Sequence, residues 1–479
     1  RAMNLYMGAE LVGMNGVISN VINILSVTEL GISTAIVYHL YGALARKDEA
    51  EIASLMNLYR KAYHVFAVLV FAAGMAVLPF IHLFMKNNSY SLSYIRVLYA
   101  MWLVRTVLSY LLTYRKSLLI ADQKEYIASI TGLILNVVSY LAIILLVTWE
   151  QNYLLALGIG TVTEVVLNIW ISWYVEQKYP FLRQRRKEKS TSSLTKRIVR
   201  DLKSLFISRI SEKMLYCTDN LIISGFIGVG TVGRYANYCM ITQAISNILT
   251  ILANTIQPTV GDYFTEKNRQ RNYEILRQLT FGFFCIASVV SVGLFSLITP
   301  FVRDIWLGPS YELGWGITVF CIVVLLVRIM GLPLSLVMGV TGLFEKEKNV
   351  GASSALLNLI VSLALVKPYG MAGVLLGTLL SYLLQILYRY IIYFRDFLEM
   401  PGEALRYAQD IGEYLAVIVG EVLLMQKIVP LIYGAGGMLL FCVCFLLCIA
   451  IPLLLDLVIF GRGWRLQSIV TMVKGMRKA

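Results

Sequence analysis

Ionisable side chains interrupt one long apolar stretch of the sequence. Residues 204–226, SLFISRISEKMLYCTDNLIISGF, are apolar enough to cross a bilayer, yet four of them carry charge. On a helix of 100° per residue the charged groups and two polar neighbours fall within about 120° of arc. A charge at the bilayer centre costs at least about 2.5–3.5 kcal/mol, so this face is expected to border water or a polar ligand. Its members are Arg209, Glu212, Lys213, Tyr216, Asp219 and Asn220.

The same face has an alternative interpretation, in which its charges neutralise one another. Arg209 with Glu212, or Glu212 with a basic residue of another span, could form ion pairs that hold helices together. Tyr216 and Asn220 extend the face without any need for pairing, which favours a hydrated cavity. The pattern leaves both interpretations open.

A second polar stripe follows in residues 236–259. Its five amide and hydroxyl side chains recur at intervals of 4, 3, 4 and 3, which gathers them within about 80° of arc on a helix. This spacing predicts a water-lined wall, and a ladder of hydrogen bonds between helices is the alternative. The stripe consists of Gln243, Asn247, Thr250, Asn254 and Gln257.

Other ionisable groups lie singly within apolar runs. Arg105 and Arg328 are cations of this kind, and Glu29 and Glu164 are acids. With the cations of 204–226 included, the basic groups exceed what local acids neutralise, which predicts an anionic ligand. The planar arginine fork matches phosphate oxygens in particular.

The elements that position these residues are membrane helices. The chain has 479 residues, 58% hydrophobic content, 15% charged residues and a mean hydropathy of +0.71, which is too apolar for a water-soluble protein of this size. Apolar runs of about 18–25 residues recur, and the alternation of a β-barrel is absent. We predict thirteen helical spans near 16–41, 63–84, 92–113, 127–148, 153–174, 203–227, 236–259, 279–300, 314–338, 350–366, 370–393, 411–432 and 436–460.

The polar gaps between these spans alternate in charge. One alternate set is rich in Lys and Arg, including the 178–203 gap and the C-terminal tail, and the other set is nearly free of both. Under the positive-inside rule the basic set is cytoplasmic, and the C-terminus with it. The net charge of +14 is then membrane-surface charge rather than a nucleic-acid site. Residue 1 falls outside, so we expect a further span before it and fourteen in the intact protein.

The sequence lacks the patterns of several enzyme classes. Three of its seven cysteines, Cys442, Cys444 and Cys448, lie in an apolar run without the CxxC pairs or His partners of zinc sites. There is no Walker loop, no HExxH and no Ser-His-Asp spacing. We therefore expect no metal, no cofactor and no enzymatic activity.

Small residues mark one predicted helix contact. Gly370, Gly373, Gly377 and Ser381 share one face of the 370–393 span. A face of small residues lets two membrane helices approach closely. We predict that this face serves packing rather than ligand binding.

Four stretches carry a resemblance to a known family. They are GAELVGMNGVISNVINILSVTELGISTAIVYHLYGALARKDEAEIASLMNLYRKAY, TDNLIISGFIGVGTVGRYANY, IWLGPSY and LVKPYGMAGVLLGTLLS. In these the chain resembles the polysaccharide transporter (Wzx-like) oligosaccharide flippases of the multidrug/oligosaccharidyl-lipid/polysaccharide exporter superfamily. The resemblance extends over essentially the whole chain and rests on glycines, polar residues and their order.

The resemblance implies an all-α integral membrane protein of two six-helix lobes plus two helices. The N-terminal lobe would be 1–178, the basic inter-lobe loop 179–195, the C-terminal lobe 196–395, and the additional helices and tail 396–479. Such proteins move undecaprenyl-pyrophosphate-linked oligosaccharides from the cytoplasmic to the outer leaflet by alternating access. A lipid II flippase or a multidrug exporter of the same superfamily is the alternative. Expected partners are the lipid-linked substrate, membrane lipids and the polysaccharide polymerase machinery, without nucleic acid.

The implied roles of the polar residues follow from this substrate. The cations would bind pyrophosphate, the amides and hydroxyls would contact sugars or water, and the acids would carry a coupling proton or act as counter-charges. The expected substrate-binding residues are Arg105, Arg209, Lys213, Tyr216, Asn220, Gln243, Asn247, Asn254, Gln257 and Arg328, and the ion-coupling candidates are Glu29, Glu164 and Asp219.

Overall fold

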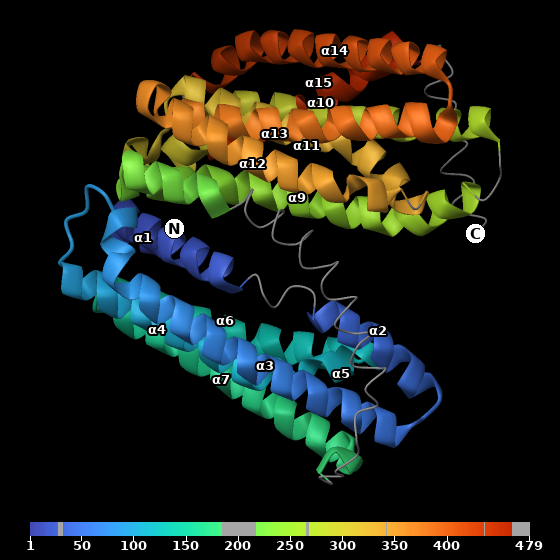
Figure 1. Cartoon of the computed structure of the whole chain (residues 1–479). Helices are drawn as coiled ribbons and strands as arrows, with labels where there is room; N and C mark the ends of the chain where they lie inside the picture. Colours follow the sequence, from blue (N-terminus) through green and yellow to red (C-terminus); the bar gives the residue numbers. More distant parts are fainter. Residues whose placement is uncertain (27–31, 184–216, 265–267, 342, 435, 462–479) are drawn as a thin grey trace. The chain divides into compact units, whose positions relative to one another are not determined.

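The regular elements of the described chain are all helical. A computed structural model of the protein describes residues 1–26, 32–183, 217–264, 268–341, 343–434 and 436–461 (Figure 1). Eleven of its helices are long and apolar enough to cross a membrane. These eleven coincide with eleven predicted spans, whereas the other two, 16–41 and 203–227, include residues outside the described ranges. The predicted all-α polytopic membrane architecture is confirmed.

The chain divides into two compact units, residues 1–233 and 234–479. The described helices of the first unit are α1 (Ala2–Leu25), α2 (Ile32–Ala45), α3 (Glu49–Val77), η2 (Leu78–Phe84), α4 (Leu92–Thr113), α5 (Lys116–Ala121), α6 (Glu125–Trp149), α7 (Tyr153–Lys178), η3 (Pro180–Arg183) and a segment at 217–226.

The first helix begins earlier than the sequence predicts. The predicted span started at residue 16, but α1 starts at Ala2, and Gly8 interrupts it with φ 79° and ψ 165°. Glycine adopts a positive φ without steric cost, so the chain bends there and the helix resumes. The C-terminal part of α1, which carries Asn15, Ser19 and Asn23, contributes one side of the site described below.

Polar capping extends several helices beyond the apolar runs. The Asp48 carboxylate accepts a hydrogen bond from the Glu51 backbone N–H and fixes the start of α3, well before the predicted span at residue 63. Apolar length measures only the membrane-crossing part of a helix, and helical hydrogen bonding continues past it. The helix therefore includes a charged segment with Arg60 and Lys61.

Helix α4 lies at the centre of the first unit's packing. It packs against α3 on one side and α7 on the other, and α6 packs against α7 (Figure 1). The Tyr99 hydroxyl donates to the Gly74 carbonyl at 3.1 Å, and a Cβ at Gly74 would lie 2.4 Å from Leu103 Cδ1. This close contact fixes α3 against one face of α4 and leaves another face for the site.

The described helices of the second unit are α9 (Val229–Tyr263, which starts at the end of the first unit), α10 (Arg269–Pro300), η4 (Phe301–Trp306), η5 (Pro309–Tyr311), α11 (Trp315–Val340), α12 (Phe344–Tyr369), α13 (Met371–Ile392), η6 (Tyr393–Leu398), α14 (Pro401–Tyr433) and α15 (Met438–Phe460).

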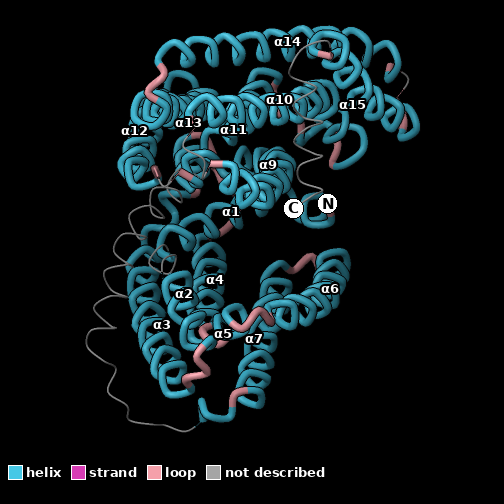
Figure 2. Tube along the Cα trace, turned by 90° about the vertical axis from the view of Figure 1, so that its right-hand side faces the viewer, coloured by secondary structure: helices cyan, strands magenta, loops and turns pink. Residues whose placement is uncertain are grey.

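Helix α10 is the core element of the second unit. Within its most apolar 18 residues 56% are buried, against 17% for α15, and it packs against α11, α14 and α15 (Figure 2). The rings of Phe281, Phe284, Tyr414 and Phe460 contact one another in stacked, tilted and edge-to-face pairs where α10, α14 and α15 meet. Such aromatic clusters contribute both buried area and directional ring contacts.

The predicted small-residue contact between α12 and α13 is confirmed. A Cβ at Gly373 would lie 2.3 Å from the Leu365 carbonyl oxygen, and one at Gly377 would lie 2.4 Å from Ser362 Oγ. The Ser381 hydroxyl is fully buried and donates to the Gly377 carbonyl. Only glycine allows this approach of the two backbones.

Candidate functional site

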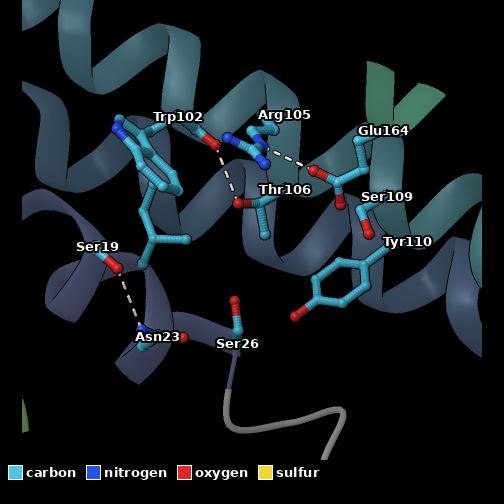
Figure 3. A pocket seen from close by; sticks show the side chains of 10 residues that line it. Ser19, Asn23, Ser26, Trp102, Arg105, Thr106, Ser109, Tyr110 and Glu164 are labelled. Atoms are coloured by element: carbon cyan, nitrogen blue, oxygen red, sulfur yellow. Dashed lines mark hydrogen bonds and ion pairs between the residues drawn. The ribbon is translucent and has the colours of Figure 1, made fainter. Parts of the chain in front are cut away.

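A polar pocket opens in the first unit among α1, α4 and α7 (Figure 3). Its volume is about 300 Å³, at the lower end of the range of ligand sites. Polar and aromatic side chains dominate the lining, which consists of Ser19, Ile22, Asn23, Ser26, Trp102, Arg105, Thr106, Ser109, Tyr110 and Glu164.

One face of α4 supplies half of this lining. Trp102, Arg105, Thr106, Ser109 and Tyr110 follow one another at intervals of 3, 1, 3 and 1. That spacing is the 3.6-residue repeat, so all five side chains project to the same side of the helix. The opposite wall repeats it on α1 with Ser19, Ile22, Asn23 and, at the helix end, Ser26.

An ion pair between α4 and α7 forms the charged part of the pocket. Arg105 Nε donates to Glu164 Oε2 at 2.7 Å, and each side chain is about a third exposed. The Arg105 guanidinium lies 5.2 Å from the centre of the Trp102 ring, a cation–π distance. Neither terminal nitrogen of Arg105 donates a hydrogen bond to another residue in the described part of the chain. Arg105 is therefore held in place through Nε while its outer edge remains available.

A hydrogen-bonded asparagine anchors the pocket at one end. Asn15 Oδ1 accepts from Trp102 Nε1 at 2.8 Å and from the Tyr153 hydroxyl at 2.6 Å. Asn152 caps the start of α7 by accepting from the backbone of Leu154 and Leu155. These bonds tie α1, α4 and α7 together, so the guanidinium rests on a fixed indole.

Hydroxyl groups line the other end of the pocket. Ser26 Oγ is buried and has no hydrogen-bond partner among the residues that the structure describes. Asn23 Nδ2 donates to Ser19 Oγ at 3.4 Å, and the Ser109 and Thr113 hydroxyls are 3.3 Å apart. The pocket thus combines the Arg105 guanidinium with the Ser26 hydroxyl, which has no hydrogen-bond partner in the described chain, and such donors suit an oxyanion.

Two residues predicted on separate spans meet in this pocket. Arg105 and Glu164 were expected as an anion-binding cation and an ion-coupling acid, and they form one pair of zero net charge. The pocket therefore holds one positive charge together with its counter-charge. An anion that binds Arg105 must share it with Glu164 or displace that carboxylate.

The C-terminal part of the 204–226 stretch lies within the described residues, from residue 217 onward. Asp219 and Asn220 lie in the helical segment 217–226 of the first unit, where Asp219 is buried and Asn220 is half-buried. Asn220 Oδ1 has no hydrogen-bond partner among the described residues. Four further predicted site residues lie outside the described ranges, namely Glu29, Arg209, Lys213 and Tyr216.

The polar stripe of α9 lies in the second unit. Gln243, Asn247 and Asn254 are exposed, and Gln257 is half-buried. Gln243 Nε2 donates to Asn247 Oδ1 at 3.1 Å, so part of the stripe is bonded along its own helix. Gln257 packs against α11, since its Nε2 lies 3.0 Å from where a Cβ at Gly339 would be.

Arg328 occupies the second unit as well. It is half-buried on α11, and its guanidinium lies 5.4 Å from the centre of the Tyr382 ring of α13. It therefore resembles Arg105 in resting on an aromatic face. The structure brings Arg105 and Glu164 into contact, and Arg328 belongs to the other unit.

Several pocket residues were not predicted from the sequence. Neutral polar residues were predicted as functional only in the 204–226 and 236–259 stretches, so the hydroxyl, amide and indole groups around Arg105 were missed. A signal was present, because polar residues recur with helical spacing in the stretches SNVINILS (19–26) and WLVRTVLSY (102–110). The missed residues are Ser19, Asn23, Ser26, Trp102, Thr106, Ser109 and Tyr110.

A second polar cluster closes the turn between α5 and α6. Asp122 Oδ2 accepts from Lys124 and from the Tyr179 hydroxyl. Burial opposes the Asp122 carboxylate, but these two hydrogen bonds outweigh it and lower its pKa. The hydrogen bond to Asp122 raises the pKa of Lys124, and burial together with Asp122 raises the pKa of Tyr179. The cluster joins the α5–α6 turn to the end of α7.

Comparison with known proteins places this architecture in a family. The model of the family described as polysaccharide biosynthesis protein matches residues 4–264, which is more than half of the chain. A search of curated proteins finds no match.

Solved structures share the fold. An inward closed lipid II flippase MurJ superposes with a TM-score of 0.67 at 16% identity, over 96% of this chain and 95% of that one. An inward-facing multidrug resistance MATE transporter of the MOP superfamily gives a TM-score of 0.64 at 15% identity, over 83% and 93%. At these identities the likeness concerns the fold alone. With the family match, the multi-pass helical architecture and the polar intramembrane pocket, the chain belongs to the polysaccharide biosynthesis protein family.

Proposed function

We propose that the protein is a flippase that moves a polyprenyl-pyrophosphate-linked oligosaccharide from the cytoplasmic to the outer leaflet for cell-surface polysaccharide synthesis. The family match and the fold shared with a lipid II flippase and a multidrug transporter support a flippase or exporter of this superfamily. The choice of an anionic lipid-linked substrate rests on the pocket of the first unit.

The observation that carries this proposal is the state of Arg105. Its Nε is bonded to Glu164, while the side chain lines the pocket and its terminal nitrogens have no hydrogen-bond partner in the described chain. A guanidinium with two free nitrogens binds two oxygens of one phosphate side by side. At about 300 Å³ the pocket suits a phosphate head group rather than a whole oligosaccharide.

Glu164 supplies a means of releasing and recapturing the head group. When its carboxylate is ionised it neutralises Arg105 and competes with phosphate. When it carries a proton or is displaced, Arg105 keeps its full charge for the ligand. Proton uptake at Glu164 would therefore favour the loaded state, in keeping with its expected ion-coupling role.

The remaining predicted residues complete the proposed transport path. Arg209, Lys213 and Arg328 would bind pyrophosphate, and the amides of α9 would contact sugars or water. Two lobes alternating between inward-open and outward-open states would carry the head group while the polyprenyl tail stays in lipid, because sugars and phosphates are too polar to cross hydrocarbon unaided. The proposed setting is the bacterial plasma membrane with a cytoplasmic C-terminus and the polymerase machinery nearby.

The proposal is tested by depleting the protein from its host and extracting lipid-linked intermediates. The expected result is accumulation of one polyprenyl-pyrophosphate oligosaccharide that a membrane-impermeant glycosidase cannot reach in intact cells. Complementation with the wild-type chain should clear it, and Arg105→Ala should not. If depletion leaves every lipid-linked intermediate unchanged, the flippase proposal is contradicted.

The structure provides a matched control for Arg105. Arg115 pairs with Glu176 of α7 at 2.5 Å and has a similar exposure, and its guanidinium lies 5.4 Å from the Tyr114 ring, but it does not line the pocket. Arg115→Ala should therefore restore export as well as the wild type does. If both variants fail equally while remaining inserted, the loss reflects helix packing and not head-group binding.

A further inference from the structure

Two carboxyl groups lie deep in the second unit and play no part in the proposed site. Glu421 on α14 and Asp456 on α15 are only 3% and 4% exposed. Both helices pack against α10 and against each other. The two carboxyl groups interact electrostatically with each other and with the Cys285 thiol of α10.

Glu421 meets α10 well beyond the charged start of that helix, and Asp456 lies four residues before the end of α15. Ser288 of α10 donates to Glu421 Oε2 at 2.5 Å. Ser288 is eleven residues beyond Arg277, so it lies about 16 Å further along α10 at 1.5 Å per residue. Arg277 is bound to Asp410, so this ion pair lies nearer the start of α10 than the carboxyl group of Glu421 does.

Most oxygens of this carboxyl pair lack a partner. Glu421 Oε1 and both Oδ atoms of Asp456 make no hydrogen bond within the described ranges. Buried polar groups are normally hydrogen-bonded, and an isolated buried carboxylate is far more costly than a neutral group. Two side chains more than nine-tenths buried therefore present three unsatisfied oxygens to their surroundings.

No described cation on the neighbouring helices neutralises the pair. Arg277 is taken by Asp410, Lys427 is exposed, and Arg271 lies about 25 Å along α10 from Ser288. Helix α15 carries no Lys or Arg. The other described cations of the packed elements are in ion pairs, which are Arg269–Glu399, Arg303–Asp304, Arg395–Asp396 and Arg406–Glu403.

We propose that Glu421 and Asp456, with the Ser288 hydroxyl, form a binding site for a small monovalent cation, a proton or Na⁺. Carboxylate and hydroxyl oxygens are the ligands that a hard cation prefers, and either occupant removes the uncompensated charge. The site is independent of Arg105, because it stands on burial and missing partners in the second unit alone.

The test uses the purified full-length protein in lipid nanodiscs. Thermal unfolding is followed while NaCl replaces choline chloride at constant ionic strength. If Na⁺ is the occupant, the midpoint rises saturably for the wild type and for the control Glu413→Gln, an exposed acid on the same helix. The response is lost in Glu421→Gln and in Asp456→Asn.

A second arm detects a proton. Infrared spectra of the wild-type protein containing aspartate labelled with ¹³C at the side-chain carboxyl should show a protonated carboxylic acid band at neutral pH that shifts with the label. Because this measurement needs no variant, it holds even where Asp456→Asn fails to fold. Where that variant does fold, the band disappears in it and persists in Glu413→Gln. The proposal is overturned if the wild-type protein shows no sodium response and no protonated aspartate band. If depletion left the lipid-linked intermediates unchanged, the flippase proposal would fail but the proposed cation site would still stand.

Discussion

Two arginine–carboxylate pairs within membrane helices differ in how their hydrogen bonds are used. In the second unit Arg277 binds Asp410 through Nε at 2.6 Å and a terminal nitrogen at 2.9 Å, and the Asp410 side chain is only 8% exposed. In the first unit Arg105 binds Glu164 through Nε, beside a pocket, and its terminal nitrogens make no hydrogen bond within the described residues. Arg277 therefore spends two donors on its partner, whereas Arg105 spends one. On the proposed function, the remaining donors of Arg105 are the ones that bind the head group.

The surroundings of the two pairs follow the same contrast. Around Arg277 the helices α10, α14 and α15 stack aromatic rings, and elsewhere in the same unit α12 and α13 touch through glycines. Around Arg105 the neighbours are hydroxyls and amides, one of which, Ser26, is unpartnered in the described chain.

The largest effect on stability is expected for Arg277→Ala. Removing one partner of a buried pair deprives the Asp410 carboxylate of the guanidinium that neutralises it, which costs about 3–5 kcal/mol of unfolding free energy. Denaturant-induced unfolding of the purified protein measures it. Arg395→Ala is the control, because its side chain is 81% exposed and its loss should cost under about 1 kcal/mol. An equal, small loss for both would show that the bidentate pair is not structural.

A smaller loss is expected at the glycine contact. In Gly373→Ala the new methyl would meet the Leu365 carbonyl oxygen of α12, so the backbones must separate, at about 1–3 kcal/mol. Gly412→Ala on α14 meets no atom within 4 Å and should stabilise by about 0.5–1 kcal/mol. The same unfolding assay compares the two. If Gly373→Ala is neutral, the close approach of α12 and α13 is not required.

Arg105→Ala should change stability little. Its pair is about a third exposed on each side and bonded through one nitrogen, so the expected cost is about 0–1 kcal/mol. Arg115→Ala should cost the same, since its pair has similar exposure. Unfolding free energies of the two variants are compared with that of Arg277→Ala. A loss above about 3 kcal/mol for Arg105→Ala would show that Arg105, like Arg277, mainly stabilises the fold.

The smallest effect concerns pH and the Asp122–Lys124 cluster. The pKa of Asp122 is lowered, so its contribution is present above the unfolded value of 3.8 and is lost as pH falls through the folded value. The pKa of Lys124 is raised, so its contribution is present below the unfolded value of 10.5 and is lost as pH rises past it. Unfolding free energy measured across pH should fall at both ends by about 0.2–0.5 kcal/mol. In Asp122→Asn the unfolding free energy should change less with pH at both the acid and the alkaline end.

The sequence predicts the spans of this protein well and its site less completely. Spans were predictable because bilayer thickness fixes apolar length, and the eleven fully described ones were all found. Their ends were not, since capping groups such as Asp48 and breaks such as Gly8 act outside the apolar runs.

Arg105 and Glu164 were predicted individually as functional, but their contact was not. The contact depends on how α4 and α7 pack, and the pattern of a single sequence does not reveal which faces of two distant spans meet. Glu421 and Asp456 also stand singly in apolar runs but were not predicted as functional, and their burial together appears only when α10, α14 and α15 pack.

The most direct test of the central claim is a binding measurement on the purified protein. Native mass spectrometry with a polyprenyl-pyrophosphate oligosaccharide should detect a bound lipid for the wild type and for Arg115→Ala, and binding at least tenfold weaker for Arg105→Ala. Polyprenol without phosphate should bind all three alike. Equal binding of the pyrophosphate lipid by the wild type and Arg105→Ala would contradict the assignment of Arg105 as the head-group ligand.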